Sequence, residues 1–84
     1  MKQYKAFIDI MPHQELLDPQ GKTVTKNIHQ LNISGVADVR IGKHIEMVLE
    51  AVDLRSAEET VEIACKKLLT NLITEKYHFR VVEN

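Results

Sequence analysis

Apolar and polar residues alternate with a period of two in four stretches of the chain. Such alternation predicts β-strands, because successive side chains of a strand point to opposite faces of a sheet. The expected strands cover residues 4–11, 36–41, 44–51 and 77–82. Pro12 should end the first strand, and a loop over 13–17 should follow it. The pair Gly42-Lys43 is typical of a two-residue hairpin turn, in which Gly42 supplies a positive φ.

The first helix is expected to begin directly after this loop. Asp18 is a typical N-cap, and Pro19 suits the first helical position, where its missing N–H costs nothing. The helix should end near Asn32. Gly21 makes it intrinsically weak, so that it depends on tertiary contacts. Asp18, Pro19 and Gly21, together with Gly42 of the predicted turn, are therefore expected to be structural residues.

The second helix has the clearer signals. Ser56 and Glu59 form a Ser-x-x-Glu capping box, which predicts the start of the helix. Glutamates lie early in this stretch, and Lys66 and Lys67 lie later, as the helix dipole favours. An apolar stripe with helical spacing is expected to face the core, and it consists of Ala57, Val61, Ala64, Cys65, Leu68 and Leu72.

The order β-α-β-β-α-β predicts an α+β domain of the ferredoxin-like type over residues 1–84. Two helices would lie on one face of a four-stranded antiparallel sheet. The other face of the sheet would then be open. A monomer rarely leaves a large contiguous apolar patch exposed. The apolar residues of the open face are therefore a candidate oligomer interface: Phe7, Met11, Val48 and Val82.

Charge and composition narrow the class of protein. The 11 Lys and Arg residues nearly balance the 12 Asp and Glu residues, which argues against nucleic-acid binding. No apolar run approaches the roughly 20 residues that span a membrane, and the N-terminus lacks the features of a signal peptide. Cys65 is the only cysteine and cannot form an internal disulfide. These features predict a soluble, cytoplasmic protein.

One motif suggests nucleotide binding, but it is incomplete. Gly-Lys-Thr at 21–23 matches the end of a phosphate-binding loop, yet that loop requires a glycine at the position of Leu16. The four histidines lack the spacing of a metal site. Cys65 lies on the apolar stripe rather than in an activating environment. We therefore predict no catalytic, cofactor-binding or metal-binding residues in this chain.

Two short stretches carry a resemblance to a known family. LDPQGK at 17–22 and DVRIGK at 38–43, in this order in a chain of 84 residues, resemble the PurS family. These proteins are the small subunits of the three-part phosphoribosylformylglycinamidine synthase (EC 6.3.5.3) of purine biosynthesis. The resemblance implies that a glutaminase subunit releases ammonia and that a large synthetase subunit uses it, with ATP and Mg. It also implies that the small subunit bridges the two, assists ammonia transfer and forms a homodimer or tetramer.

The resemblance gives three charged residues a candidate role in contact with these partners. Arg40 and Lys43 lie on a polar strand face and at the predicted turn, where little in the expected structure requires a charge. Asp38 lies beside them. A small-molecule regulatory module of ferredoxin-like fold remains an alternative to the bridging subunit. It would have a ligand pocket at a dimer interface, lined by loop glycines.

Overall fold

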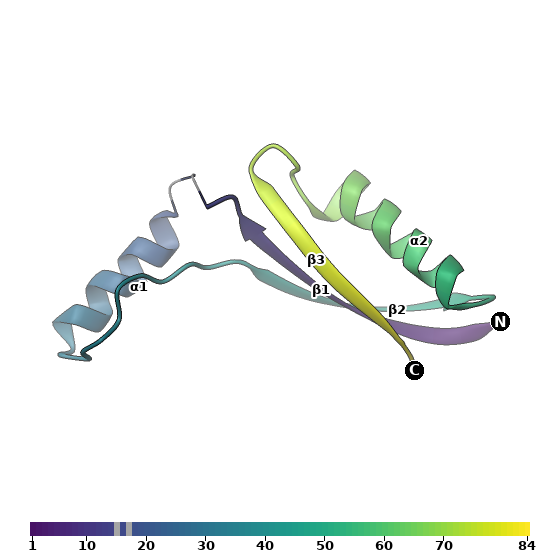
Figure 1. Ribbon diagram of the computed structural model, residues 1–84, viewed down its shortest axis with the longest axis horizontal. Coiled ribbons are helices and arrows are strands. Elements are labelled where there is room, and N and C mark those ends of the chain that lie inside the picture. The colour runs from purple at the N-terminus through teal and green to yellow at the C-terminus, as the bar shows by residue number, and fades with distance from the viewer. Residues whose placement is uncertain (15, 17) are drawn as a thin grey trace.

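Three strands form one antiparallel sheet in the computed structural model, which describes residues 1–14, 16 and 18–84 (Figure 1). The strands are β1 (Lys2–Pro12), β2 (Lys43–Ala51) and β3 (Glu75–Glu83), in the order β2-β1-β3. The expected loop over 13–17 includes Glu15 and Leu17, which lie outside the described residues. The strands predicted over 4–11, 44–51 and 77–82 are thus confirmed.

The core lies between one face of this sheet and α2 (Leu54–Ala64). Its buried side chains come from the central strand and from the helix: Tyr4, Ala6, Ile8, Ile10, Ala57, Val61 and Cys65. Alternate residues of the outer strands pack against them: Ile45, Met47, Leu49, Tyr77, Phe79 and Val81. Burial of a large aliphatic side chain stabilises a fold by about 1.5–3 kcal/mol. The period-two pattern therefore predicts the inner face of the sheet correctly.

The four-stranded sheet predicted from the sequence is wrong, because residues 36–41 form no strand. Main-chain groups of this segment bond to α1 (Pro19–Gln30) and its cap instead of to a neighbouring strand. The Ile41 N–H donates to the Asp18 carboxylate at 2.8 Å, and the Val36 carbonyl lies 2.8 Å from His29 Nε2. The predicted hairpin turn is wrong too. Gly42 does not have a positive φ, whereas Gly35 does, at 89°.

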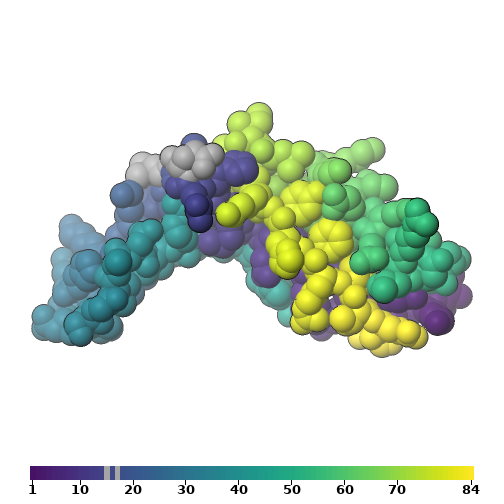
Figure 2. All heavy atoms as spheres, in the orientation of Figure 1, coloured from purple at the N-terminus to yellow at the C-terminus, as the bar shows by residue number. Residues whose placement is uncertain are grey.

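The prediction of two helices on one sheet face is also wrong. α2 covers the sheet, whereas α1 extends away from the end of the sheet where β1 finishes (Figure 1). We call residues 18–42, which comprise α1 and the segment that returns along it, the arm. Figure 2 shows the molecule as an arch with the arm as one limb. Its radius of gyration is 16.6 Å, whereas a compact chain of this length would have about 12 Å.

Both ends of the second helix differ from the prediction. The N-cap is Asp53, whose carboxylate accepts the Ser56 N–H at 2.8 Å, so the helix begins before the predicted capping box. A π-helical turn, Cys65–Leu69, follows α2. A π-turn holds an extra residue and shifts the phase of the stripe. As a result Leu69 packs against the core, and Leu68 is 81% exposed. Leu72, the last predicted core residue, is also exposed.

Candidate functional site

Asp18 fastens the two ends of the arm to each other. One carboxylate oxygen accepts the Gly21 N–H at 3.0 Å and so caps α1, as the sequence predicts. The other oxygen accepts the Ile41 N–H at 2.8 Å and lies 3.9 Å from the Arg40 guanidinium. The Asp18 side chain is buried. The hydrogen bonds from Gly21 and then Ile41 lower the pKa of its carboxyl below the ordinary 3.8.

Arg40 holds the chain that leaves β1. Its guanidinium donates to four main-chain carbonyls, those of Pro12 (3.3 Å), His13 (2.9 Å), Gln14 (3.2 Å) and Leu16 (3.4 Å). A guanidinium has five N–H donors and can serve several acceptors at once. The interpretation that Arg40 has little structural reason to be charged is therefore wrong. The Arg40 guanidinium thus links the segment that follows β1 to the segment that returns along α1.

The other two candidates for partner contact are less constrained. The Lys43 ammonium lies 3.6 Å from the Glu75 carboxylate, across the base of the arm. Asp38 is exposed and lines two grooves beside α1. The structure thus brings Asp38 close to α1 and leaves it open to solvent, while Arg40 and Lys43 are engaged within the chain.

Gly21 and Gly42 permit close approaches of the main chain. A Cβ atom at Gly21 would collide with the Val39 carbonyl oxygen and with the Asp18 carboxylate. A Cβ atom at Gly42 would collide with the Ile10 carbonyl oxygen and with the sulfur of Met11. These two positions therefore require glycine because of space rather than because of φ.

The open face of the sheet carries three ordered rows of side chains. Each row runs across β2, β1 and β3, and the rows are Val48–Lys5–Val82, Glu46–Phe7–Arg80 and His44–Asp9–His78. Charges surround Phe7, because the Arg80 guanidinium lies 4.2 Å from its ring centroid and the Lys5 ammonium 5.3 Å. Met11 lies beyond the third row. Lys5 thus stands between Val48 and Val82, and the row of His44, Asp9 and His78 separates Phe7 from Met11.

His44 lies between two carboxylates on this face. Its Nδ1 is 2.7 Å from Asp9 Oδ1, and its Nε2 is 3.2 Å from Glu46 Oε2. Ionised carboxylates only accept hydrogen bonds, so the protonated ring can donate from both of its nitrogens, one to each carboxylate. The hydrogen bond to Asp9, followed by that to Glu46, raises the pKa of His44 above the ordinary 6.5.

Replacement of His44 by glutamine should lower the melting temperature in a pH-dependent way. Because the folded-state pKa is raised, the stabilisation is fully present below pH 6.5 and is lost as the pH rises through the folded-state pKa. All three side chains are about half exposed, so we expect a difference of at most roughly 5 °C. Thermal melts between pH 6 and pH 9 measure it. A difference that stays constant over this range, or one that His78→Gln reproduces, would contradict the assignment.

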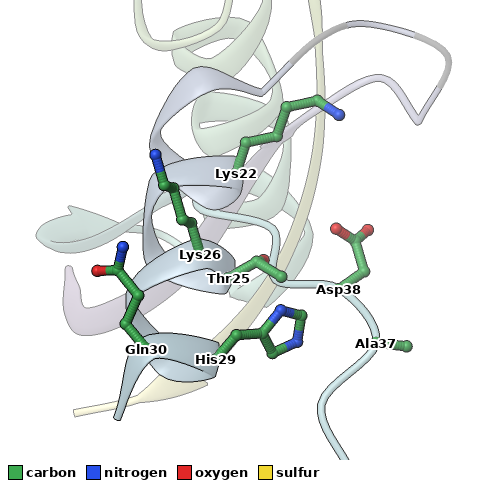
Figure 3. Close-up of a pocket in the computed structure, with 7 residues that line it drawn as sticks. All are labelled: Lys22, Thr25, Lys26, His29, Gln30, Ala37 and Asp38. Carbon is green, nitrogen blue, oxygen red and sulfur yellow. The ribbon is translucent and has the colours of Figure 1, made fainter. Parts of the chain in front are cut away.

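A groove with a volume of about 640 Å³ lies along α1 (Figure 3). Lys22, Lys26 and His29 line it from the helix, and Ala37 and Asp38 line it from the returning segment. The sequence reasoning missed these basic residues, because it placed the first helix against the sheet. The sequence does contain one signal of a basic helix, because residues 19–30 include no Asp or Glu.

Other kinds of site find no support in residues 1–14, 16 and 18–84. Within these ranges no three His, Cys, Asp or Glu side chains are grouped so that they could hold a metal ion. No described helix is long and apolar enough to cross a bilayer. Burial raises the pKa of the Cys65 thiol, which is fully covered by the core.

Comparison with known proteins gives a consistent result. The PurS family model, described as phosphoribosylformylglycinamidine (FGAM) synthase, matches residues 5–83. The chain is 38% identical to phosphoribosylformylglycinamidine synthase subunit PurS of Bacillus subtilis strain 168, over 95% of this chain and 94% of that protein. It is 38% identical to the PurS subunit of Synechocystis sp. PCC 6803, over 93% of this chain and 78% of that protein.

A solved structure extends the similarity to the whole fold. A chain in the structure of PurLQS from Thermotoga maritima superimposes with a TM-score of 0.91 at 32% identity. The superposition covers 98% of this chain and all of that one (100%). The three-stranded sheet and the projecting arm are therefore shared with a protein solved as part of an assembly.

Proposed function

The chain belongs to the PurS family, and from this membership we propose that it is the small, non-catalytic subunit of phosphoribosylformylglycinamidine synthase. The observation that carries the proposal is the match of nearly the whole chain to proteins that bear this subunit name. We propose that the subunit joins the glutaminase to the ATP-dependent synthetase and assists the transfer of ammonia between them. ATP and Mg would be used by the synthetase subunit.

The shape of the chain supports a bridging role. The extents of 52 × 26 × 14 Å give a small protein an unusually long reach, with the sheet at one end and the arm at the other. Ammonia released into water near neutral pH becomes ammonium, which is not nucleophilic. A subunit that holds the glutaminase and the synthetase together keeps the path of ammonia between their active sites closed to water. Such a subunit needs rigid contact surfaces rather than catalytic groups.

Self-association is a further part of the proposal. Phe7, Met11, Val48 and Val82 lie on the sheet face that α2 leaves uncovered, and Val48 is 56% exposed. Burying these side chains against another copy would remove apolar surface from water. We propose that copies of the chain join through this face and that the assembly works in the cytoplasm, where soluble biosynthetic enzymes act.

Reconstitution tests the proposed function. The purified chain is mixed with the glutaminase and a tagged synthetase subunit, and we expect all three to be recovered on the tag. Glutamine-dependent formation of phosphoribosylformylglycinamidine should require the chain and should fall at least tenfold without it. Native mass spectrometry of the recovered assembly counts the copies. Turnover by the chain alone, or full glutamine-dependent activity in its absence, would refute the proposal.

A further inference from the structure

α1 presents a basic face that has no ion pair with the residues that the structure describes. Lys22 and Lys26 are four residues apart and therefore share one side of the helix. Both are exposed, and neither takes part in an ion pair among the described residues. Arg40 and Lys43 differ from these two lysines, because each already lies near a carboxylate of the same chain.

The groove beside these lysines has a fixed opposite wall. The His29 Nε2 lies 2.8 Å from the Val36 carbonyl oxygen, and since a carbonyl can only accept, this nitrogen carries the hydrogen. The bond ties the returning segment to the last turn of α1. At the other end Asp18 ties Ile41 to the first turn. Figure 3 shows Lys22, Lys26 and His29 on the helix side of the groove and Ala37 and Asp38 across from them.

The charge of the groove indicates what it can hold. The described lining contains two ammonium groups, those of Lys22 and Lys26, and one carboxylate, that of Asp38, so it attracts anionic groups. A compact phosphate would favour free N–H groups at a helix start, but the carboxylate of Asp18 already occupies the start of α1. Exposed, flexible lysines along an open groove suit an extended segment that carries several carboxylates.

The helix α2 of a second copy offers few unpaired carboxylates to such a groove. The acidic side of α2 is largely neutralised within its own chain, because Glu59 lies 3.5 Å from Arg55 and Glu62 lies 3.4 Å from Lys66. We propose that the groove formed by Lys22, Lys26 and His29 docks an acidic segment of a partner subunit of the synthase. This inference rests on the proposed function, and it gives the arm the role of a contact limb.

Charge reversal of the two lysines tests the inference in the assembled complex. In Lys22→Glu with Lys26→Glu we expect binding to one partner subunit to weaken about tenfold or more at low salt. High salt screens exposed charges, so the difference from the wild type should narrow there. Lys2→Glu with Lys67→Glu is the matched control, because it makes the same change in net charge at exposed positions outside the arm. Circular dichroism verifies that both variants fold.

The outcomes separate this inference from the proposed function. If the wild-type chain binds neither partner, the proposed function fails. If it binds and the Lys22/Lys26 variant binds equally well, only the inference fails. Equal losses in the variant and its control would show a general charge effect and would also overturn it. The inference is likewise overturned if the variant loses self-association but still binds both partner subunits. It is also overturned if the wild-type groove binds free ATP and the partner subunits do not displace the ATP.

Discussion

Replacement of Asp18 by alanine should open the arm and raise the rate of amide hydrogen exchange in α1 about thirtyfold. The change removes the helix cap, and loss of an N-cap typically costs about 1 kcal/mol. It also leaves the partly buried Ile41 N–H without its acceptor, and an unsatisfied N–H of this kind costs about 1 kcal/mol. Together such losses correspond to one to two orders of magnitude in the opening equilibrium. Exchange measured amide by amide distinguishes α1 from β1, whose protection should change little.

Two comparisons sharpen this prediction. Asp18→Asn keeps a side-chain oxygen that can cap α1 but replaces the acceptor for Ile41 by a donor, so its effect should be intermediate. The pKa of Asp18 is lowered in the folded chain, so its stabilisation is present above pH 3.8 and is lost as the pH falls through the folded-state pKa. The difference between the wild type and Asp18→Ala should therefore shrink in acid. Unchanged exchange in Asp18→Ala at neutral pH would show that the carboxylate does not hold the arm.

Gly42→Ala should be strongly destabilising, because the added methyl group has no room. The new Cβ would collide with the Ile10 carbonyl oxygen and the Met11 sulfur, at the place where the returning arm enters β2. The Met11 side chain can move, but the main chain of β1 is fixed by both neighbouring strands. Overpacking of this kind costs about 1–3 kcal/mol or more, which lowers the melting temperature of a small domain by roughly 10 °C.

Gly35→Ala is the control, because the same methyl group would cause strain there through the backbone conformation and not through a collision. No atom lies within 4 Å of the position that its Cβ would take, but φ is 89°. The cost is then mainly the left-handed backbone conformation, about 1 kcal/mol. Thermal melts should rank Gly42→Ala clearly below Gly35→Ala. The reverse ranking would mean that β1 and β2 can separate at Gly42 at little cost.

The sequence predicts the sheet well, because the alternation of β1, β2 and β3 is a direct result of one face being buried. It fails for residues 36–41, which alternate in the same way. Alternation indicates that one side of an extended chain is covered, but it does not indicate which element covers that side. Here α1 and its cap provide the cover, and the N–H of Ile41 bonds to a carboxylate 23 residues earlier in the chain. The prediction of a fourth strand is therefore wrong, because these residues bond to α1 and its cap instead of to a strand.

The candidate site was predictable only in part. Asp18 and Pro19 identify the start of α1, because capping is a local property of the sequence. The role of Arg40 could not be predicted, since its acceptors are main-chain carbonyls 24–28 residues away, and carbonyls carry no sequence signal. The basic groove was missed for a related reason. Lys22 and Lys26 gain their meaning from the position of α1 outside the sheet layer, which depends on the whole topology.

The length of the arm also affects how many copies an experiment reports. A compact protein with the same radius of gyration, 16.6 Å, would contain about 200 residues. A single copy of this 84-residue chain should therefore elute from a gel-filtration column well ahead of compact standards of its own mass of 9.6 kDa. An elution volume calibrated with compact standards would make a monomer look like a dimer, and a dimer look like a larger assembly. Only a measurement of mass that does not depend on shape gives the stoichiometry.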